Sequence, residues 1–141
     1  MEGNMNRQLF QAVSKLRVQE AQVLLKANQH AGAYYLIGYA IECALKACVA
    51  KQVKRYDFPD KKIANEAFTH DLEKLMKVAG LAPEFERDRK ANASLDLNWA
   101  VVKDWSESVR YDLGITAAQA RDLFSACTGK DGVLPWVKNK W

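Results

Sequence analysis

The hydrophobic and polar positions along this chain repeat with the period of a helix, and the alternation typical of strands is missing from the sequence. In residues 6–28, one helical face is apolar and the other carries the charged side chains. The apolar positions are Phe10, Val13, Ala21 and Leu24, with Leu16 beside them. This segment predicts an amphipathic first helix that packs one face against a core.

A second helix is predicted over residues 31–55, and it is apolar on most of its sides. Its stretch YYLIGYAIECALKACVAK, from Tyr34 to Lys51, is about as long as a membrane span. However, Glu42 and Lys46 lie near its middle, where a charge is costly in a bilayer. The sequence therefore favours the buried central helix of a bundle over a transmembrane helix.

Turn and cap residues divide the middle of the chain. A loop is expected around Pro59, because proline bars a continuous helix there. Thr69 is the expected N-cap of a short third helix that Gly80 ends. Pro83 suits the start of a fourth helix, in which Ser94 marks a bend.

The last part of the chain contains one strong helix signal. The segment DWSESVRYDLGI shows no convincing period and predicts a connector. Thr116 and Gln119 then form a capping box for a last helix over about 117–128. Pro135 is expected to end regular structure within a basic, tryptophan-containing tail at about 130–141.

Together these elements predict a single all-α domain over residues 1–141, an up-and-down bundle of four to five helices. The net charge of +4 and the pI of about 9.0 permit nucleic-acid binding without requiring it. The N-terminal residues contain no continuous apolar run of the kind found in signal peptides. A cytoplasmic protein is therefore expected.

The three cysteines do not form the pattern of a disulfide framework or of a zinc site. They are Cys43, Cys48 and Cys127, an odd number, and two of them lie in the apolar second helix. A reducing compartment explains free cysteines best. The sequence has no second cysteine pair and no His-x-x-His to complete a zinc site, so neither a metal nor a cofactor is predicted.

Glu42 and Lys46 are the first candidates for chemistry, because they are charged residues in an apolar helix. They stand one helical turn apart, with the acid N-terminal to the base, which is the favourable order for a salt bridge. One interpretation is an intrahelical pair that contributes a few tenths of a kcal/mol. The other is a polar patch that serves a groove or an interface.

Three stretches resemble HEPN domains of bacteria: AYYLIGYAIECALKACVA, THDLEKLMKVAGL and WSESVRYD. The resemblance covers roughly residues 7–128. It implies a helical bundle that pairs with itself, and many members of the family are metal-independent ribonucleases, often toxins encoded beside a nucleotidyltransferase-like antitoxin. The second-helix Glu-x3-Lys of many members lies near the cleft between the two copies, and it matches Glu42 and Lys46 here.

The catalytic signature of the family is an arginine followed, four to six residues later, by a histidine, and this chain departs from it. Arg110 stands at about the right place, but the positions that follow it at this distance carry no histidine. Metal-free RNA cleavage needs proton transfer near neutral pH, which histidine performs and arginine does not. Arg110 by itself therefore supports phosphate binding better than catalysis.

The chain has only two histidines, His30 and His70, and both lie upstream of Arg110. His70, at the start of the third helix, and Tyr111 are weak candidates for the missing proton-transfer group. The structural alternatives are a histidine that packs against a neighbouring helix and an Arg110 that pairs with Glu42 or Asp104 to hold the connector. The candidate ligand-binding residues are Glu42, Lys46, Arg110 and Tyr111.

The four tryptophans divide into two groups. Trp99 and Trp105 are expected to be anchors of the core or of a dimer interface. Trp136 and Trp141 alternate with lysines in the tail, a pattern that can stack nucleobases, although a tail folded onto the bundle is the commoner arrangement.

Three functions remain open from the sequence. The first is a homodimeric HEPN-like module that binds RNA, a nucleotide or a protein partner without the usual ribonuclease activity. The second is a metal-independent ribonuclease with an altered active site. The third is a partner-binding subunit of a toxin–antitoxin or defence system. The absent histidine disfavours the second function. The pI and the basic clusters KQVKRY (51–56), DKK (60–62) and WVKNKW (136–141) mildly favour the first over the third.

Overall fold

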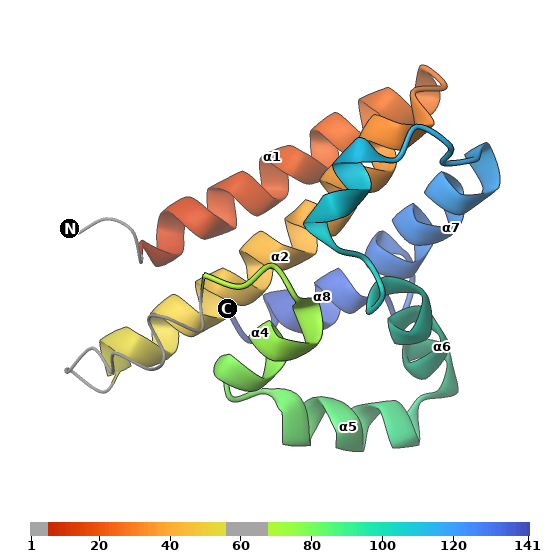
Figure 1. The fold of residues 1–141 in the computed structure, drawn as a ribbon. Helices are drawn as coiled ribbons and strands as arrows, with labels where there is room; N and C mark the ends of the chain where they lie inside the picture. The colour runs from red at the N-terminus through yellow and green to blue at the C-terminus, as the bar shows by residue number, and fades with distance from the viewer. Residues whose placement is uncertain (1–5, 56–67) are drawn as a thin grey trace.

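The computed structural model describes residues 6–55 and 68–141, and the loop predicted around Pro59 lies outside the described residues (Figure 1). All regular elements of the described residues are helices, so the prediction of an all-α bundle is confirmed. The two longest, α1 (Arg7–Lys26) and α2 (His30–Arg55), form an antiparallel pair. The Asn6 side chain caps α1 by accepting a hydrogen bond of 3.0 Å from the backbone N–H of Leu9.

One face of α1 packs against α2. Ala21 is completely buried, and the Ser14 hydroxyl, also buried, donates a hydrogen bond of 2.7 Å to the carbonyl oxygen of Ala40 on α2. Leu16, by contrast, is 46% exposed and lies on the outer face of α1, which the apolar pattern did not predict. The hydrogen bond from Ser14 to Ala40 satisfies a hydroxyl group that would otherwise be costly to bury between the two helices.

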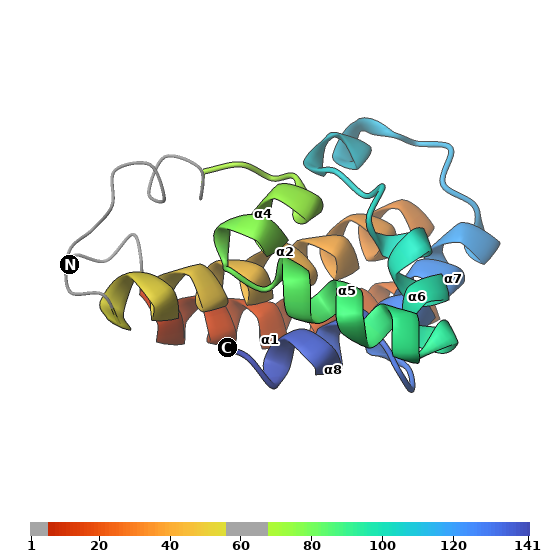
Figure 2. The same ribbon diagram turned by 90° about the horizontal axis from the view of Figure 1, so that it is seen from below.

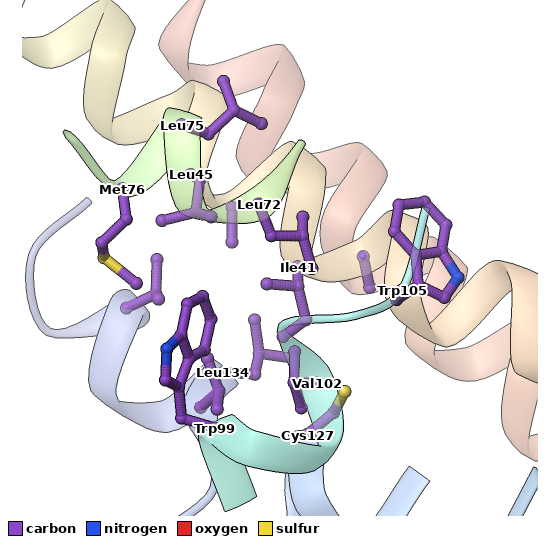
Figure 3. Close-up of a cluster of buried hydrophobic side chains, with 14 of the residues drawn as sticks. Ile41, Leu45, Leu72, Leu75, Met76, Trp99, Val102, Trp105, Cys127 and Leu134 are labelled. Atoms are coloured by element: carbon purple, nitrogen blue, oxygen red, sulfur yellow. The ribbon is translucent and has the colours of Figure 1, made fainter. Parts of the chain in front are cut away.

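The central position predicted for α2 is confirmed. Figure 2 shows α1 on one side of α2, with α4 (Leu72–Val78) and the 3-10 helix η2 (Glu107–Tyr111) on the other. By length and composition α2 could cross a membrane, but 72% of its most apolar window is buried inside the fold. Figure 3 shows Ile41 and Leu45 of α2 within the hydrophobic core. Burial of this kind is what the core helix of a bundle requires.

Helix α4 (Leu72–Val78) packs on α2 through Leu72 and Leu75, both completely buried. Its N-cap is Asp71, whose side chain accepts from the N–H of Lys74, so the prediction that Thr69 caps this helix is wrong. The Thr69 hydroxyl instead accepts from the N–H of Asp71 at 3.1 Å. This contact orders the turn that leads into α4.

The predicted fourth helix is two helices, α5 (Ala82–Ala91) and α6 (Ala93–Val102). The chain breaks at Asn92, which has an extended backbone (φ −138°, ψ 99°) and caps α6 through its side chain. The bend therefore lies two residues before Ser94, because asparagine supplies the capping oxygen. Pro83 lies in the first turn of α5, as predicted.

The connector contains a short 3-10 helix, η2 (Glu107–Tyr111), which the sequence pattern did not predict. It begins just after Trp105, which is 2% exposed, and Trp99 on α6 is 5% exposed, so both tryptophans are core anchors. The capping box of Thr116 and Gln119 is present and begins α7 (Ala117–Thr128) as predicted.

The C-terminal tail is ordered, and the prediction that Pro135 ends regular structure is wrong. Residues Val133–Lys138 form α8, and Pro135 lies in its first turn, where a backbone N–H has no intrahelical partner. The indole N–H of Trp136 donates to Asp88 at 2.8 Å, and its ring lies 4.6 Å from that of Phe85. Because the predicted fourth helix is broken at Asn92 and α8 is added at the C-terminal end, the described residues contain more and shorter helices than the four to five expected.

Candidate functional site

A buried carboxylate on α2 is the centre of the candidate site. Glu42 is 1% exposed although it can carry a charge. Its Oε2 accepts a hydrogen bond of 3.1 Å from Nζ of Lys46, one helical turn further along α2. The predicted intrahelical pair is therefore formed, but its acid faces the interior rather than solvent, where an unpaired charge is costly.

His70 provides the second partner of the same oxygen. Its Nδ1 lies 2.9 Å from Glu42 Oε2, and its side chain is 43% exposed. Because Leu72 and Leu75 hold α4 against α2, the turn that precedes α4 brings His70 onto the central helix. The imidazole thus has one nitrogen on a buried carboxylate and the rest of the ring at the surface.

Glu107, on η2, completes the row of contacts. Its Oε2 lies 3.3 Å from Nε2 of His70 and 3.8 Å from a guanidinium nitrogen of Arg110. We call Lys46, Glu42, His70, Glu107 and Arg110, in this order of contact, the polar cluster. It joins α2, the start of α4 and η2, three segments that are far apart in the sequence.

Arg110 does not pair with Glu42 or Asp104, the two partners suggested by the sequence. It faces Glu107 because residues three apart lie above one another in a 3-10 helix. The guanidinium carbon lies 4.8 Å from the centroid of the Tyr111 ring. The neighbouring Tyr111 phenol is the largest cause that raises the pKa of Arg110 above its ordinary value, with smaller contributions from Tyr35 and Glu107.

The structure therefore connects the predicted residues Glu42, Lys46 and Arg110 through two residues between them. His70 was a weak candidate in the sequence, and Glu107 was missed. The signal for Glu107 was its place three residues before Arg110 in the segment ESVR. That spacing brings two side chains together only if the segment is helical, and five residues are too few to show a helical period.

The chemistry of this arrangement follows from its donors and acceptors. When ionised, the Glu42 carboxylate only accepts hydrogen bonds, so this contact favours the His70 tautomer with its proton on Nδ1 and directs Nε2 outwards. The second oxygen of Glu42, Oε1, is buried and has no hydrogen-bond partner among residues 6–55 and 68–141. A histidine oriented in this way can donate or accept a proton at Nε2, while Arg110 can hold an anionic oxygen.

The other predicted features lie apart from the polar cluster. The tail tryptophans are packed: Trp136 contacts Phe85, and the Trp141 ring has Lys15 and Lys138 near its faces at 5.8 and 5.7 Å. The three cysteines are free and buried, and burial raises the pKa of the Cys43 and Cys48 thiols to about 12. Within residues 6–55 and 68–141, no group of three or more His, Cys, Asp or Glu side chains is placed to hold a metal ion.

The chain was compared with family models, with curated proteins and with solved structures. None of the three comparisons gave a match. Membership of the HEPN family therefore stays a proposal that rests on the sequence motifs and on the all-α fold.

Proposed function

We propose that this chain is a HEPN-like homodimeric module of the cytoplasm that binds RNA, with a phosphodiester held at the polar cluster. The observation that carries the proposal is that Nε2 of His70 and the guanidinium of Arg110 face one and the same carboxylate oxygen, Glu107 Oε2. With Nδ1–H directed at Glu42, Nε2 is a donor only in the protonated imidazolium, and in that form it converges with the Arg110 guanidinium on an anionic oxygen, as both would on a phosphate.

Exposed aromatic rings near the polar cluster favour RNA over a protein partner. Tyr111 is 73% exposed and follows Arg110 directly, and Phe68 is 68% exposed and lies two residues before His70. Exposed rings beside a phosphate-binding group can stack on unpaired bases, at about 1–3 kcal/mol per base. The basic pI of about 9.0 agrees with a polyanionic ligand.

Binding is tested by fluorescence anisotropy with a labelled, mixed-sequence, single-stranded RNA in EDTA. Arg110→Ala should weaken binding by roughly 10-fold or more, because a hydrogen bond to a charged group contributes about 1.5–3 kcal/mol. Arg121→Ala is the matched control, since it removes an exposed arginine of α7 outside the polar cluster. Equal affinities of the wild type and Arg110→Ala would exclude a phosphate contact at Arg110.

A second candidate function is a metal-independent ribonuclease, and the contact between Glu42 and His70 favours it. In this reaction, His70 takes the proton of a 2′-hydroxyl through Nε2, and the 2′-oxygen attacks the adjacent phosphorus. The 5′-oxygen leaves with a proton from an acid, for which Tyr111 is the candidate, and a 2′,3′-cyclic phosphate remains.

The nuclease is tested by incubating labelled total RNA with the purified protein in EDTA. Cleavage should fall about 10²–10⁴-fold in His70→Ala if the imidazole transfers the proton. Cleavage by the wild type no greater than that of a mock preparation would leave RNA binding as the function. A nucleotidyltransferase-like antitoxin is the protein partner that the family resemblance proposes, and co-purification with such a protein tests it separately.

A further inference from the structure

The contacts of His70 differ in strength on its two sides. On the inner side, Nδ1 lies 2.9 Å from the buried Glu42 carboxylate, within the range of a normal hydrogen bond. On the outer side, Nε2 lies 3.3 Å from Glu107, and Arg110 lies 3.8 Å from the same oxygen, both beyond that range. The inner contact therefore positions the imidazole, whereas the outer carboxylate is held loosely.

The surroundings of Glu107 allow its side chain to leave. Its side chain is 37% exposed. It belongs to η2, a five-residue 3-10 helix that has no side-chain cap hydrogen bond and no buried residue. Among the described residues, a rotation of this side chain into solvent would break the two long contacts with His70 and Arg110 and would not open the hydrophobic core.

We infer that the Glu107 carboxylate occupies the phosphate position of the RNA site and competes with the ligand for His70 and Arg110. The inference rests on the RNA-binding function proposed above. A carboxylate and a phosphate both present anionic oxygens to the Arg110 guanidinium and to Nε2–H of the protonated His70 imidazole, so one must leave when the other binds. A nucleic-acid strand adds contacts that a carboxylate lacks, such as stacking on Tyr111, and these offset the loss of the internal contacts.

This competition lowers the affinity of the site in a calculable way. If the site is free of Glu107 for only ~10% of the time, the apparent affinity is about tenfold weaker than the intrinsic one. Removal of the charge at position 107 should therefore raise the apparent affinity for RNA by about tenfold. Glu107→Gln keeps the size of the side chain, and its partly exposed position on η2 makes misfolding a small risk.

The experiment measures the affinity of the wild type and of three variants for a labelled 20-nucleotide single-stranded RNA by fluorescence anisotropy in EDTA. Glu107→Gln should bind about tenfold more tightly than the wild type. Glu73→Gln is the matched control, because Glu73 is exposed in the first turn of α4, three residues after His70, and loses the same charge. In Glu107→Gln with Arg110→Ala, the gain should disappear.

Three results would overturn the inference, and they separate it from the function on which it rests. If the wild type binds RNA and Glu107→Gln binds it with equal or lower affinity, Glu107 does not compete with the ligand. The proposed RNA-binding function would still stand. An equal gain in Glu73→Gln would show a general charge effect and have the same consequence. RNA binding by neither the wild type nor Glu107→Gln would remove both the proposed function and the inference.

Discussion

At the scale of single residues, Glu42 is the side chain on which the candidate site depends. One buried oxygen accepts from Lys46 and contacts His70, so this carboxylate links a helix-local pair to a group brought in by the fold. Its burial also makes it the costliest residue of the polar cluster to remove, because its loss leaves a cavity and two polar partners without an acceptor.

We expect Glu42→Ala to lower the free energy of unfolding by about 3 kcal/mol, the typical cost of breaking a buried charge pair. Urea denaturation followed by circular dichroism measures this change. Glu73→Ala, at an exposed position of α4, should change stability by less than about 0.5 kcal/mol. A loss in Glu42→Ala as small as in this control would mean that the contacts of Glu42 contribute nothing to folding.

At the scale of elements, the position of η2 depends on how closely Trp105 approaches α2. A β-carbon at Gly38 of α2 would overlap the indole of Trp105, which also stacks on Tyr35 with ring centroids 6.1 Å apart. Glu107 and Arg110 follow Trp105 by two and five residues. The missing side chain at position 38 therefore allows the connector to lie against the central helix and to complete the polar cluster.

Gly38→Ala should destabilise the fold by about 1–3 kcal/mol, because overpacking forces the indole to move. Gly32→Ala is the matched control on the same helix: there the nearest atom is the flexible end of Leu24 at 3.1 Å, and alanine improves helix propensity by up to about 1 kcal/mol. Thermal unfolding followed by tryptophan fluorescence compares the two variants. Equal melting temperatures would contradict the close packing of Trp105.

At the scale of the whole molecule, the outer face of α1 is an apolar stripe. Leu9, Leu16 and Val23 are 54%, 46% and 66% exposed, and their seven-residue spacing places them on one helical face. An open, mainly apolar groove of about 630 Å³, lined by residues that include Leu16, Val23 and Leu36, lies along this face. A stripe of this kind supports the proposed homodimer, because exposed apolar patches often mark interaction surfaces.

We expect the wild type to be a dimer at micromolar concentration and Leu16→Glu to be a monomer, because the substitution places a charge in the middle of the stripe. Multi-angle light scattering gives the mass of each species. Gln22→Glu is the control, since Gln22 is exposed on α1 but lies about 100° around the helix from Val23. A monomeric wild type would contradict the homodimer, and a dimeric Leu16→Glu would place its interface elsewhere.

Features that depend on neighbours along the chain could be predicted from the sequence. The apolar periodicity indicated an all-α bundle with α2 at its centre, and the capping box marked the start of α7. The pair of Glu42 and Lys46 follows from a spacing of four residues on a helix. For each of these, the interacting groups are at most one helical turn apart, so local geometry is sufficient.

The tertiary structure alone decided the rest of the candidate site. The contact of His70 with Glu42 joins residues 28 positions apart, and its contact with Glu107 depends on where η2 lies. Helix α8 likewise forms where Trp136 meets Phe85 and Asp88, although Pro135 suggested an end to regular structure. These contacts form only when separate helices bury their apolar faces against α2, and no local pattern in the chain specifies which surface polar groups that packing brings together.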